Sequence, residues 1–232
     1  MSSSAVTSAG RSQASRIVNE LRRAIVACEY APGDRLHIAS LASSFDASPG
    51  AVREALSRLA GEHLVIAIEQ RGFRVSDLSI DDMLDLYSTR AMLEQRMASE
   101  SVKSGGAEWR KALTECHERL QRFGPNTLIS NDVIEAHEDY HRQLLAACPS
   151  HWLKRLHETL YRASERYRFY MYQYLAGQRN VMGEHAAIYE AAIAGDHELT
   201  GLLVRRHVEQ TRDLLASGLE NRVSEDLAVK AV

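Results

Sequence analysis

The sequence lacks the features of a disulfide-stapled, linker-rich or membrane-spanning protein. Its three cysteines, Cys28, Cys116 and Cys148, lie far apart and in no CxxC pair, a pattern that fits free thiols in a reducing compartment. Only four prolines are present and no interior run is rich in glycine or serine, so we expect no long disordered linker. No uncharged apolar run approaches the roughly 18 to 20 residues that span a bilayer.

The first ten residues carry no basic segment followed by an apolar core, so no secretory signal is predicted. We therefore expect a cytoplasmic protein without a membrane partner. A length of 232 residues, of which 45% are hydrophobic, permits one large or two modest domains, each with a hydrophobic core.

Charge is distributed unevenly along the chain. Residues 11–76 hold nine basic and seven acidic side chains, whereas residues 77–232 hold 19 basic and 24 acidic ones. The N-terminal part is the less acidic one, and the chain has no large positive charge overall. This balance argues against indiscriminate coating of nucleic acid and suits a small, local footprint on DNA.

Residues 48–59 (SPGAVREALSRL) predict a short amphipathic helix. Ser48 is a suitable N-cap and is followed by proline, which suits the first helical turn. Apolar residues at 52, 56 and 59 form one stripe, and Arg53 and Arg58 lie off it, where they can meet phosphate. A shorter helix is predicted over residues 38–45, only a few residues upstream, which is the pattern of a helix-turn-helix.

A two-stranded wing is predicted after this helix. Residues 64–68 and 73–75 are β-prone, and the turn between them contains Arg71 and Gly72. A glycine at the tip lets the backbone approach a groove wall, and the arginines at positions 71 and 74 can neutralise phosphates.

Residues 15–76 resemble the winged helix-turn-helix of the GntR family of bacterial transcription regulators. The resemblance rests on residues 32–36 (PGDRL), 52–56 (VREAL) and 71–75 (RGFRV). It departs from the family at Ala39, Pro49 and Gly50, so some DNA contacts of relatives are missing. The resemblance implies double-stranded operator DNA as the partner, and as contact residues Ser48, Arg53, Arg58, Arg71, Gly72 and Arg74.

From residue 77 onward the pattern is helical throughout. Apolar residues recur at helical spacing, and glycine or proline ends the segments. Six helices are predicted, over residues 80–103, 109–123, 132–147, 151–174, 179–194 and 197–217.

Four histidines in this region suggest a metal site. His137 and His141 are four residues apart on one predicted helix, so both imidazoles leave the same face. His185 and His207 lie on the last two predicted helices, which can bring them to one level. Read by themselves, such histidines are also compatible with surface or packing roles.

Residues 77–220 resemble the all-helical FCD ligand-binding domain of the FadR-type branch of the GntR family. The resemblance is carried by residues 140–141 (YH), 184–185 (EH), 195–196 (GD) and His207. It implies a divalent metal at the floor of an effector cavity, held in the family by three histidines and an aspartate. The aspartate position is His137 in this chain, with Glu138 as the nearest alternative. The implied metal ligands are His137, His141, His185 and His207.

Ligation by imidazoles alone favours zinc, nickel or copper over magnesium, calcium or manganese. The expected ion is zinc, with nickel as the alternative. A fourth neutral ligand also leaves the full charge of the ion for an incoming anion. The resemblance further places Arg90 in the effector cavity, where it would bind a small carboxylate. The alternative role of Arg90 is a surface ion pair with Glu94.

The sequence therefore predicts a mainly α protein with an N-terminal winged helix-turn-helix and an all-α helical-bundle (FCD) domain. The expected segments are a disordered tail (1–13), the DNA-binding domain (14–76), the metal- and effector-binding domain (77–220) and a C-terminal tail (221–232). The expected function is that of a homodimeric regulator, a repressor that a small organic acid relieves. The alternatives are a metal-free regulator that binds an acyl-coenzyme A, and a metal-dependent hydrolase or lyase with a DNA-binding head.

Overall fold

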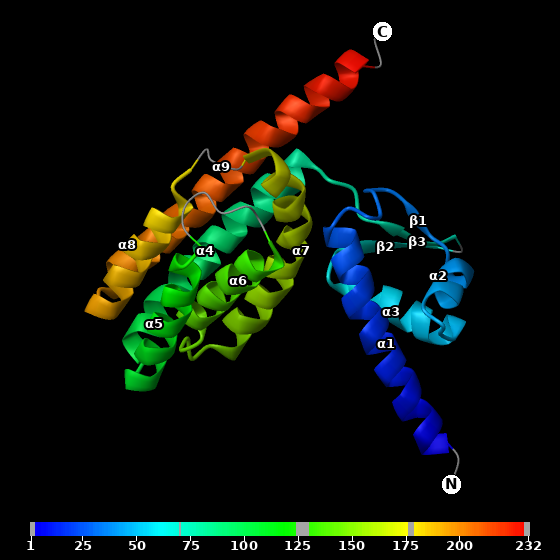
Figure 1. The fold of residues 1–232 in the computed structure, drawn as a ribbon, viewed down its shortest axis with the longest axis horizontal. Coiled ribbons are helices and arrows are strands. Elements are labelled where there is room, and N and C mark those ends of the chain that lie inside the picture. Colours follow the sequence, from blue (N-terminus) through cyan, green and yellow to red (C-terminus); the bar gives the residue numbers. More distant parts are fainter. Residues whose placement is uncertain (1–2, 70, 124–129, 176–178, 230–232) are drawn as a thin grey trace. The chain divides into compact units, whose positions relative to one another are not determined.

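The computed structural model describes residues 3–69, 71–123, 130–175 and 179–229 (Figure 1). The chain forms two compact units. The first comprises residues 1–79 with a short stretch, 161–170, and the second comprises residues 80–160 and 171–232. The described parts are mainly helical, as predicted.

The first unit is a winged helix-turn-helix. Its helices pack around a core that includes Ile17, Leu21, Leu56 and Leu64, all fully buried. The three strands form one antiparallel sheet in the order β1-β3-β2. The elements are α1 (Ser3–Val26), β1 (Arg35–Leu36), α2 (Ile38–Ser44), α3 (Pro49–Gly61), β2 (Val65–Ile68) and β3 (Gly72–Val75).

Helix α3 begins where the sequence predicts it. Ser48 is its N-cap, with extended backbone, and the Ser48 hydroxyl accepts a hydrogen bond from the Ala51 amide at 3.2 Å. Val52, Leu56 and Leu59 are fully buried. The predicted apolar stripe therefore faces the core and leaves the opposite face of the helix to solvent.

The wing is confirmed, but the sheet has a third strand that the sequence did not predict. β1 contains only two residues, which is too short for an alternating pattern to be recognised. It pairs with β3, so that Arg35 lies opposite Arg74 and Leu36 lies opposite Phe73.

The terminal helices differ from the predicted boundaries. α1 begins at Ser3 in a segment predicted as a disordered tail, and α9 continues to Val229, beyond the predicted start of the C-terminal tail at residue 221. Neither stretch contains proline, so the backbone of each can continue the helix that it adjoins.

Six helices are described in the second unit, close to the positions that the sequence predicts, and residues 161–170 of one of them group with the first unit. α4 and α9 pack against each other along much of their length (Figure 1), and the core includes Met97, Leu113, Tyr140 and Ile188. The helices are α4 (Ile80–Ser104), α5 (Ala107–Gln121), α6 (Asn131–Leu145), α7 (His151–Leu175), α8 (Val181–Ala194) and α9 (His197–Val229).

A tight joint connects α8 to α9. Gly195 ends α8 in the left-handed conformation, with φ of 81°. The Asp196 amide donates a hydrogen bond to the Ala191 carbonyl at 3.0 Å, which closes the helix end. This joint folds the two helices against each other, and each contributes one histidine of the candidate site.

No helix in the described parts of the chain combines the length and the apolar character needed to cross a membrane.

Candidate metal centre and DNA-binding surface

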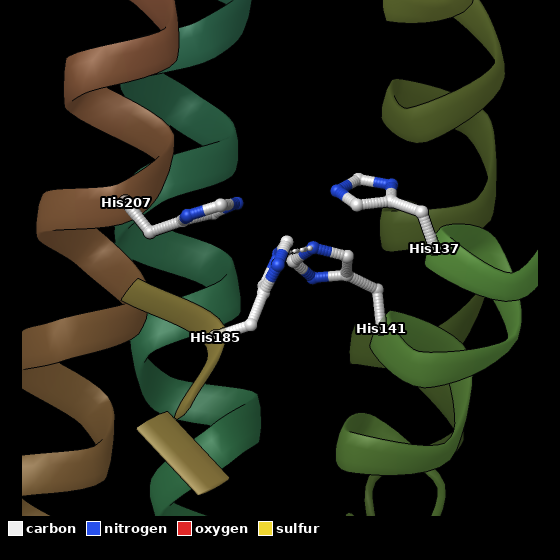
Figure 2. A group of neighbouring side chains, drawn as sticks. All are labelled: His137, His141, His185 and His207. Carbon is white, nitrogen blue, oxygen red and sulfur yellow. Dashed lines mark hydrogen bonds between the residues drawn. The ribbon is translucent and has the colours of Figure 1, made fainter. Parts of the chain in front are cut away.

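Four histidine side chains from three helices converge in the second unit. His137 and His141 leave α6, His185 leaves α8 and His207 leaves α9, and the imidazoles point toward one another (Figure 2). One ring nitrogen from each lies within 4.8 Å of the others. The structure thus brings together all four predicted metal ligands, and among the described residues Glu138 is not a member of this group.

One pair of nitrogens in this group already has the spacing that two ligands of one divalent ion show. The Nε2 atoms of His141 and His185 are 3.1 Å apart. Four nitrogens bound tetrahedrally to zinc at about 2.0 to 2.1 Å lie about 3.3 Å from one another. Two facing lone pairs repel each other unless a proton or a cation lies between them, and an all-imidazole donor set is one that zinc and nickel accept.

The surroundings of His185 and His207 favour their neutral form. His141, His185 and His207 are buried, and His137 is half-buried. Burial lowers the pKa of His185 well below its usual range, and the charges of His207 and His137 lower it further. Burial also lowers the pKa of His207, although the hydrogen bond to Glu184 opposes this shift. Neutral imidazole is the form that binds metal.

The backbone of His185 is also held in place by a hydrogen bond. The Tyr140 hydroxyl donates a hydrogen bond to the His185 carbonyl at 3.0 Å, and both residues are fully buried. Because Tyr140 precedes His141 on α6, this bond ties the helix that carries two of the histidines to the helix that carries the third.

Arg90 lies inside the second unit rather than on its surface. Its Nε and Nη2 atoms donate to one oxygen of Glu94 at 2.9 and 2.7 Å, and both residues are buried. The pair considered in the sequence analysis therefore exists, but its predicted place at the surface is wrong. The burial arises because α4 turns this face toward the interior, where the guanidinium also lies over the Tyr87 ring at 5.0 Å.

Glu94 stays ionised in this setting. Burial raises the pKa of Glu94, but Arg90 and His157 together lower it by more, to about 2. The Glu94 charge in turn raises the pKa of His207, which indicates that the carboxylate lies near the histidine group. Arg90 and Glu94 thus form a buried charged pair close to the candidate metal centre.

The predicted DNA contacts lie in two parts of the first unit. Arg53 is exposed on α3, on the side away from the buried stripe, and Arg58 is also exposed, with Glu54 as its ion-pair partner at 2.5 Å. In the wing, Arg71 is exposed, and Gly72 has a φ of 91°, a conformation that favours glycine. Arg74 forms an ion pair with Asp77 at 2.5 Å.

Arg35 is a basic residue of the wing that the sequence analysis did not single out. β1 places the exposed Arg35 directly opposite Arg74 on β3. The neighbouring pair, Leu36 and Phe73, packs on the core side, so the two arginines share the outer face of the sheet. Like charges directly opposite each other are unfavourable unless an anion offsets them. Arg35 belongs to the PGDRL motif, but the sequence did not show that this residue pairs with β3.

Two family models match the chain. Residues 13–75 match the bacterial regulatory proteins of the gntR family, and residues 85–210 match the FCD domain. The first match covers the winged helix-turn-helix, and the second covers all four histidines.

Individual proteins show the same relationship. The chain is 39% identical over 196 residues to BphR of Paraburkholderia xenovorans (strain LB400), named as an uncharacterized HTH-type transcriptional regulator, across 82% of this chain and 80% of BphR. It is 28% identical over 195 residues to the HTH-type transcriptional repressor GlaR of Escherichia coli (strain K12), across 81% and 89% of the two chains. The fold is similar to that of E. coli McbR/YncC, with a TM-score of 0.76 at 20% identity over 89% of this chain and 98% of that one.

Proposed function

This chain belongs to the gntR family of bacterial regulatory proteins and carries an FCD domain. We propose the following mechanism for it as a transcription regulator. A homodimer binds operator DNA through its winged helices, and a small carboxylate bound over a histidine-held divalent metal changes the affinity for DNA. The families and relatives are transcription regulators and not enzymes, so the hydrolase or lyase alternative is dropped.

The convergence of His137, His141, His185 and His207 supports this proposal most strongly. These four side chains would hold the ion, with zinc as the first expectation and nickel as the second. The bound ion would act as a Lewis acid that accepts an oxygen of the effector. Because all four ligands are neutral, the whole positive charge of the ion is available to an anion.

Arg90 supplies a second positive charge near this centre. Its guanidinium already forms an ion pair with Glu94. To bind Arg90, the carboxylate effector must therefore compete with Glu94 or bind beside it. A buried arginine is suited to this role, because its planar group binds carboxylates through two parallel hydrogen bonds.

On the DNA side, α3 enters the major groove and the wing follows the adjacent backbone. We assign base or phosphate contacts to Ser48, Arg53 and Arg58, and phosphate contacts to the wing at Arg71, Gly72 and Arg74, with Arg35 added. Two copies of this surface in a dimer would read a near-palindromic operator. Since the operator is bacterial DNA, we place the protein in the cytoplasm.

Repression relieved by the effector is the proposed sign of the response, and one relative, GlaR, is named as a repressor. The acid must bind more tightly to the arrangement that releases DNA, because a ligand with equal affinity for both arrangements shifts nothing. A coupling of about 1 to 3 kcal/mol changes operator occupancy by roughly 5 to 150-fold.

DNA binding by the full chain tests this proposal. Sheared DNA from the source bacterium is passed over the metal-loaded protein, the enriched fragments are sequenced, and the site is used in fluorescence anisotropy with a panel of small organic acids. We expect a near-palindromic site, at least one acid that weakens binding, and loss of that response after chelation. Arg53→Ala should lose operator affinity, whereas Arg96→Ala, a surface arginine of α4 paired with Glu100, should not.

An acid response that survives complete removal of metal would contradict the proposed mechanism. In that case the panel is extended to acyl-coenzyme A thioesters, the metal-free alternative.

A further inference from the structure

His207 has a carboxylate partner on the neighbouring helix. The Nδ1 atom of His207 is 2.9 Å from the Oε2 atom of Glu184. Glu184 directly precedes His185 on α8, so one of these adjacent side chains joins the histidine group while the other contacts α9. Only 7% of the His207 side chain and 23% of the Glu184 side chain are exposed, which makes this a hydrogen bond with limited access to water.

Arg179 holds the same carboxylate from the other side. Its Nε atom donates to Oε1 of Glu184 at 2.5 Å, and Nη2 donates to Oε2. The guanidinium also donates to the Thr211 hydroxyl at 2.7 Å and to the His207 carbonyl at 2.8 Å. Arg179 therefore fixes Glu184 relative to the first turns of α8 and to the middle of α9.

These contacts decide which nitrogen of His207 carries the proton. The Nδ1 atom also lies 3.2 Å from Nη2 of Arg179. Arginine can only donate, and its Nη2 atom already has the His207 carbonyl and Glu184 as nearer acceptors. The carboxylate can only accept while it is ionised. Nδ1 must then carry the proton, so the lone pair of the neutral ring lies on Nε2.

The geometry around Glu184 agrees with this assignment. Arg179 donates to both carboxylate oxygens, through Nε to Oε1 and through Nη2 to Oε2. Such a bidentate pairing is typical of an ionised carboxylate, which can only accept hydrogen bonds.

We propose that Glu184 is a positioning residue of the metal centre, which fixes the Nδ1-protonated form of His207 and directs Nε2 at the ion, and that Arg179 keeps Glu184 in place. The inference rests on the proposed metal site. Carboxylate partners of this kind orient the ring and raise the basicity of the ligating nitrogen, and their loss typically weakens metal binding by about 10 to 100-fold. In Figure 2 the His207 ring extends toward the other three histidines, as this assignment requires.

The competing explanation is a structural ion pair that only joins α8 to α9. Zinc affinity of the full chain distinguishes the two, measured by competition with a chromogenic chelator at neutral pH. Glu184→Ala should bind zinc about 10 to 100-fold more weakly than the wild type, whereas Glu184→Gln, which keeps an acceptor oxygen, should retain most of the affinity. The matched control is Glu209→Ala, which removes the Arg205 ion pair on the exposed side of α9 and should leave zinc affinity unchanged.

The tautomer of His207 is tested without any substitution. In the metal-free wild type, the nitrogen-15 shifts of the His207 ring should show the proton on Nδ1, and Glu184→Ala should shift the population toward Nε2. This measurement tests the assigned tautomer alone, and the zinc affinities distinguish a role at the metal centre from a purely structural contact.

Three outcomes would overturn the proposal. They are a proton on Nε2 in the metal-free wild type, zinc affinity of Glu184→Ala within twofold of the wild type, and an equal loss in Glu209→Ala. Failure of the metal site itself looks different, because the wild type then binds no zinc while its His207 tautomer can still be read.

Discussion

At the scale of single residues, His137 is the member of the candidate metal centre that would most affect its chemistry. It lies with His141, His185 and His207 at the position where the resembled family has aspartate. A carboxylate there would offset part of the charge of the ion, whereas imidazole leaves that charge intact and selects for softer ions. The identity of this one residue therefore bears on both metal choice and anion binding.

His137→Asp should change the metal preference of the full chain. The variant should bind manganese more tightly relative to zinc than the wild type does, because a carboxylate oxygen suits harder ions. Competition between the two metals, followed by elemental analysis, measures the ratio. His151→Asp places the same charge on an exposed position of α7 and should leave the ratio unchanged; equal ratios in all three proteins would remove His137 from the ligand set.

Glu94 should link the stability of the second unit to pH. The folded pKa of about 2 lies below the ordinary value of 4.5, so the stabilising contribution is fully present above pH 4.5 and is lost as the pH falls toward 2. Glu94→Gln leaves Arg90 buried without its counter-charge and should lower the free energy of unfolding at pH 7 by about 3 kcal/mol.

Urea unfolding of chelator-treated protein, followed by tryptophan fluorescence, measures this effect, because both tryptophans, Trp109 and Trp152, lie in the second unit. The difference between Glu94→Gln and the wild type should shrink below pH 4.5. A difference that stays constant down to pH 3 would show that the Glu94 charge is not what stabilises this unit.

Some of these residues could be identified from the sequence and others could not. His137 and His141 could be identified because they are four residues apart on one helix, and His185 and His207 were implied by the resemblance to the FCD domain. The burial of Arg90 depends on which face α4 turns inward, and Glu184 contacts His207 across two helices. Such contacts depend on three-dimensional packing, which a single sequence does not contain.

At the scale of elements, the joint between α8 and α9 determines where His185 and His207 meet. Gly195 adopts φ of 81° at this joint, a conformation that costs other residues about 1 kcal/mol or more. The next residue, Asp196, returns a hydrogen bond to Ala191 and begins the turn into α9.

Gly195→Ala should therefore lower the free energy of unfolding of the second unit by about 1 kcal/mol. Urea unfolding followed by tryptophan fluorescence checks this value. Gly61→Ala is the control, because Gly61 lies in α3 without a positive φ and with open space around its Cα, and it lies in the other unit. A Gly195→Ala protein as stable as the wild type would show that the joint tolerates a side chain.

The wing offers a separate test at the element scale. Arg35 and Arg74 face each other on neighbouring strands, and a phosphate near both would offset their repulsion. If Arg35 neutralises one phosphate, Arg35→Ala should reduce the slope of log affinity for DNA against log salt by about 0.9.

Fluorescence anisotropy on one DNA duplex across several salt concentrations gives this slope. Arg96→Ala, at an exposed position of α4, serves as the control and should keep the wild-type slope. An unchanged slope in Arg35→Ala would exclude β1 from the DNA-binding surface.

The elements themselves were largely predictable. Six helices were found close to their predicted positions, and α3 begins at its predicted cap. β1 was missed because two residues carry no periodicity. The ends of α1 and α9 differ because a tail rich in helix-compatible residues gives little sign of where a helix stops.

At the scale of the whole molecule, the gntR-family domain precedes the FCD domain along the sequence. The proposed regulation requires the acid to favour one arrangement of the two DNA-binding units in the dimer. The metal centre is the point on which this account depends, because the effector is proposed to bind through it.

Metal content is therefore the most direct measurement. Untagged protein is purified without chelators and analysed by elemental analysis, beside His141→Ala and His137→Ala. We expect about one zinc or nickel ion per chain in the wild type and loss of the ion in both variants. The absence of metal from every preparation, even after reloading with zinc and nickel, would contradict this expectation.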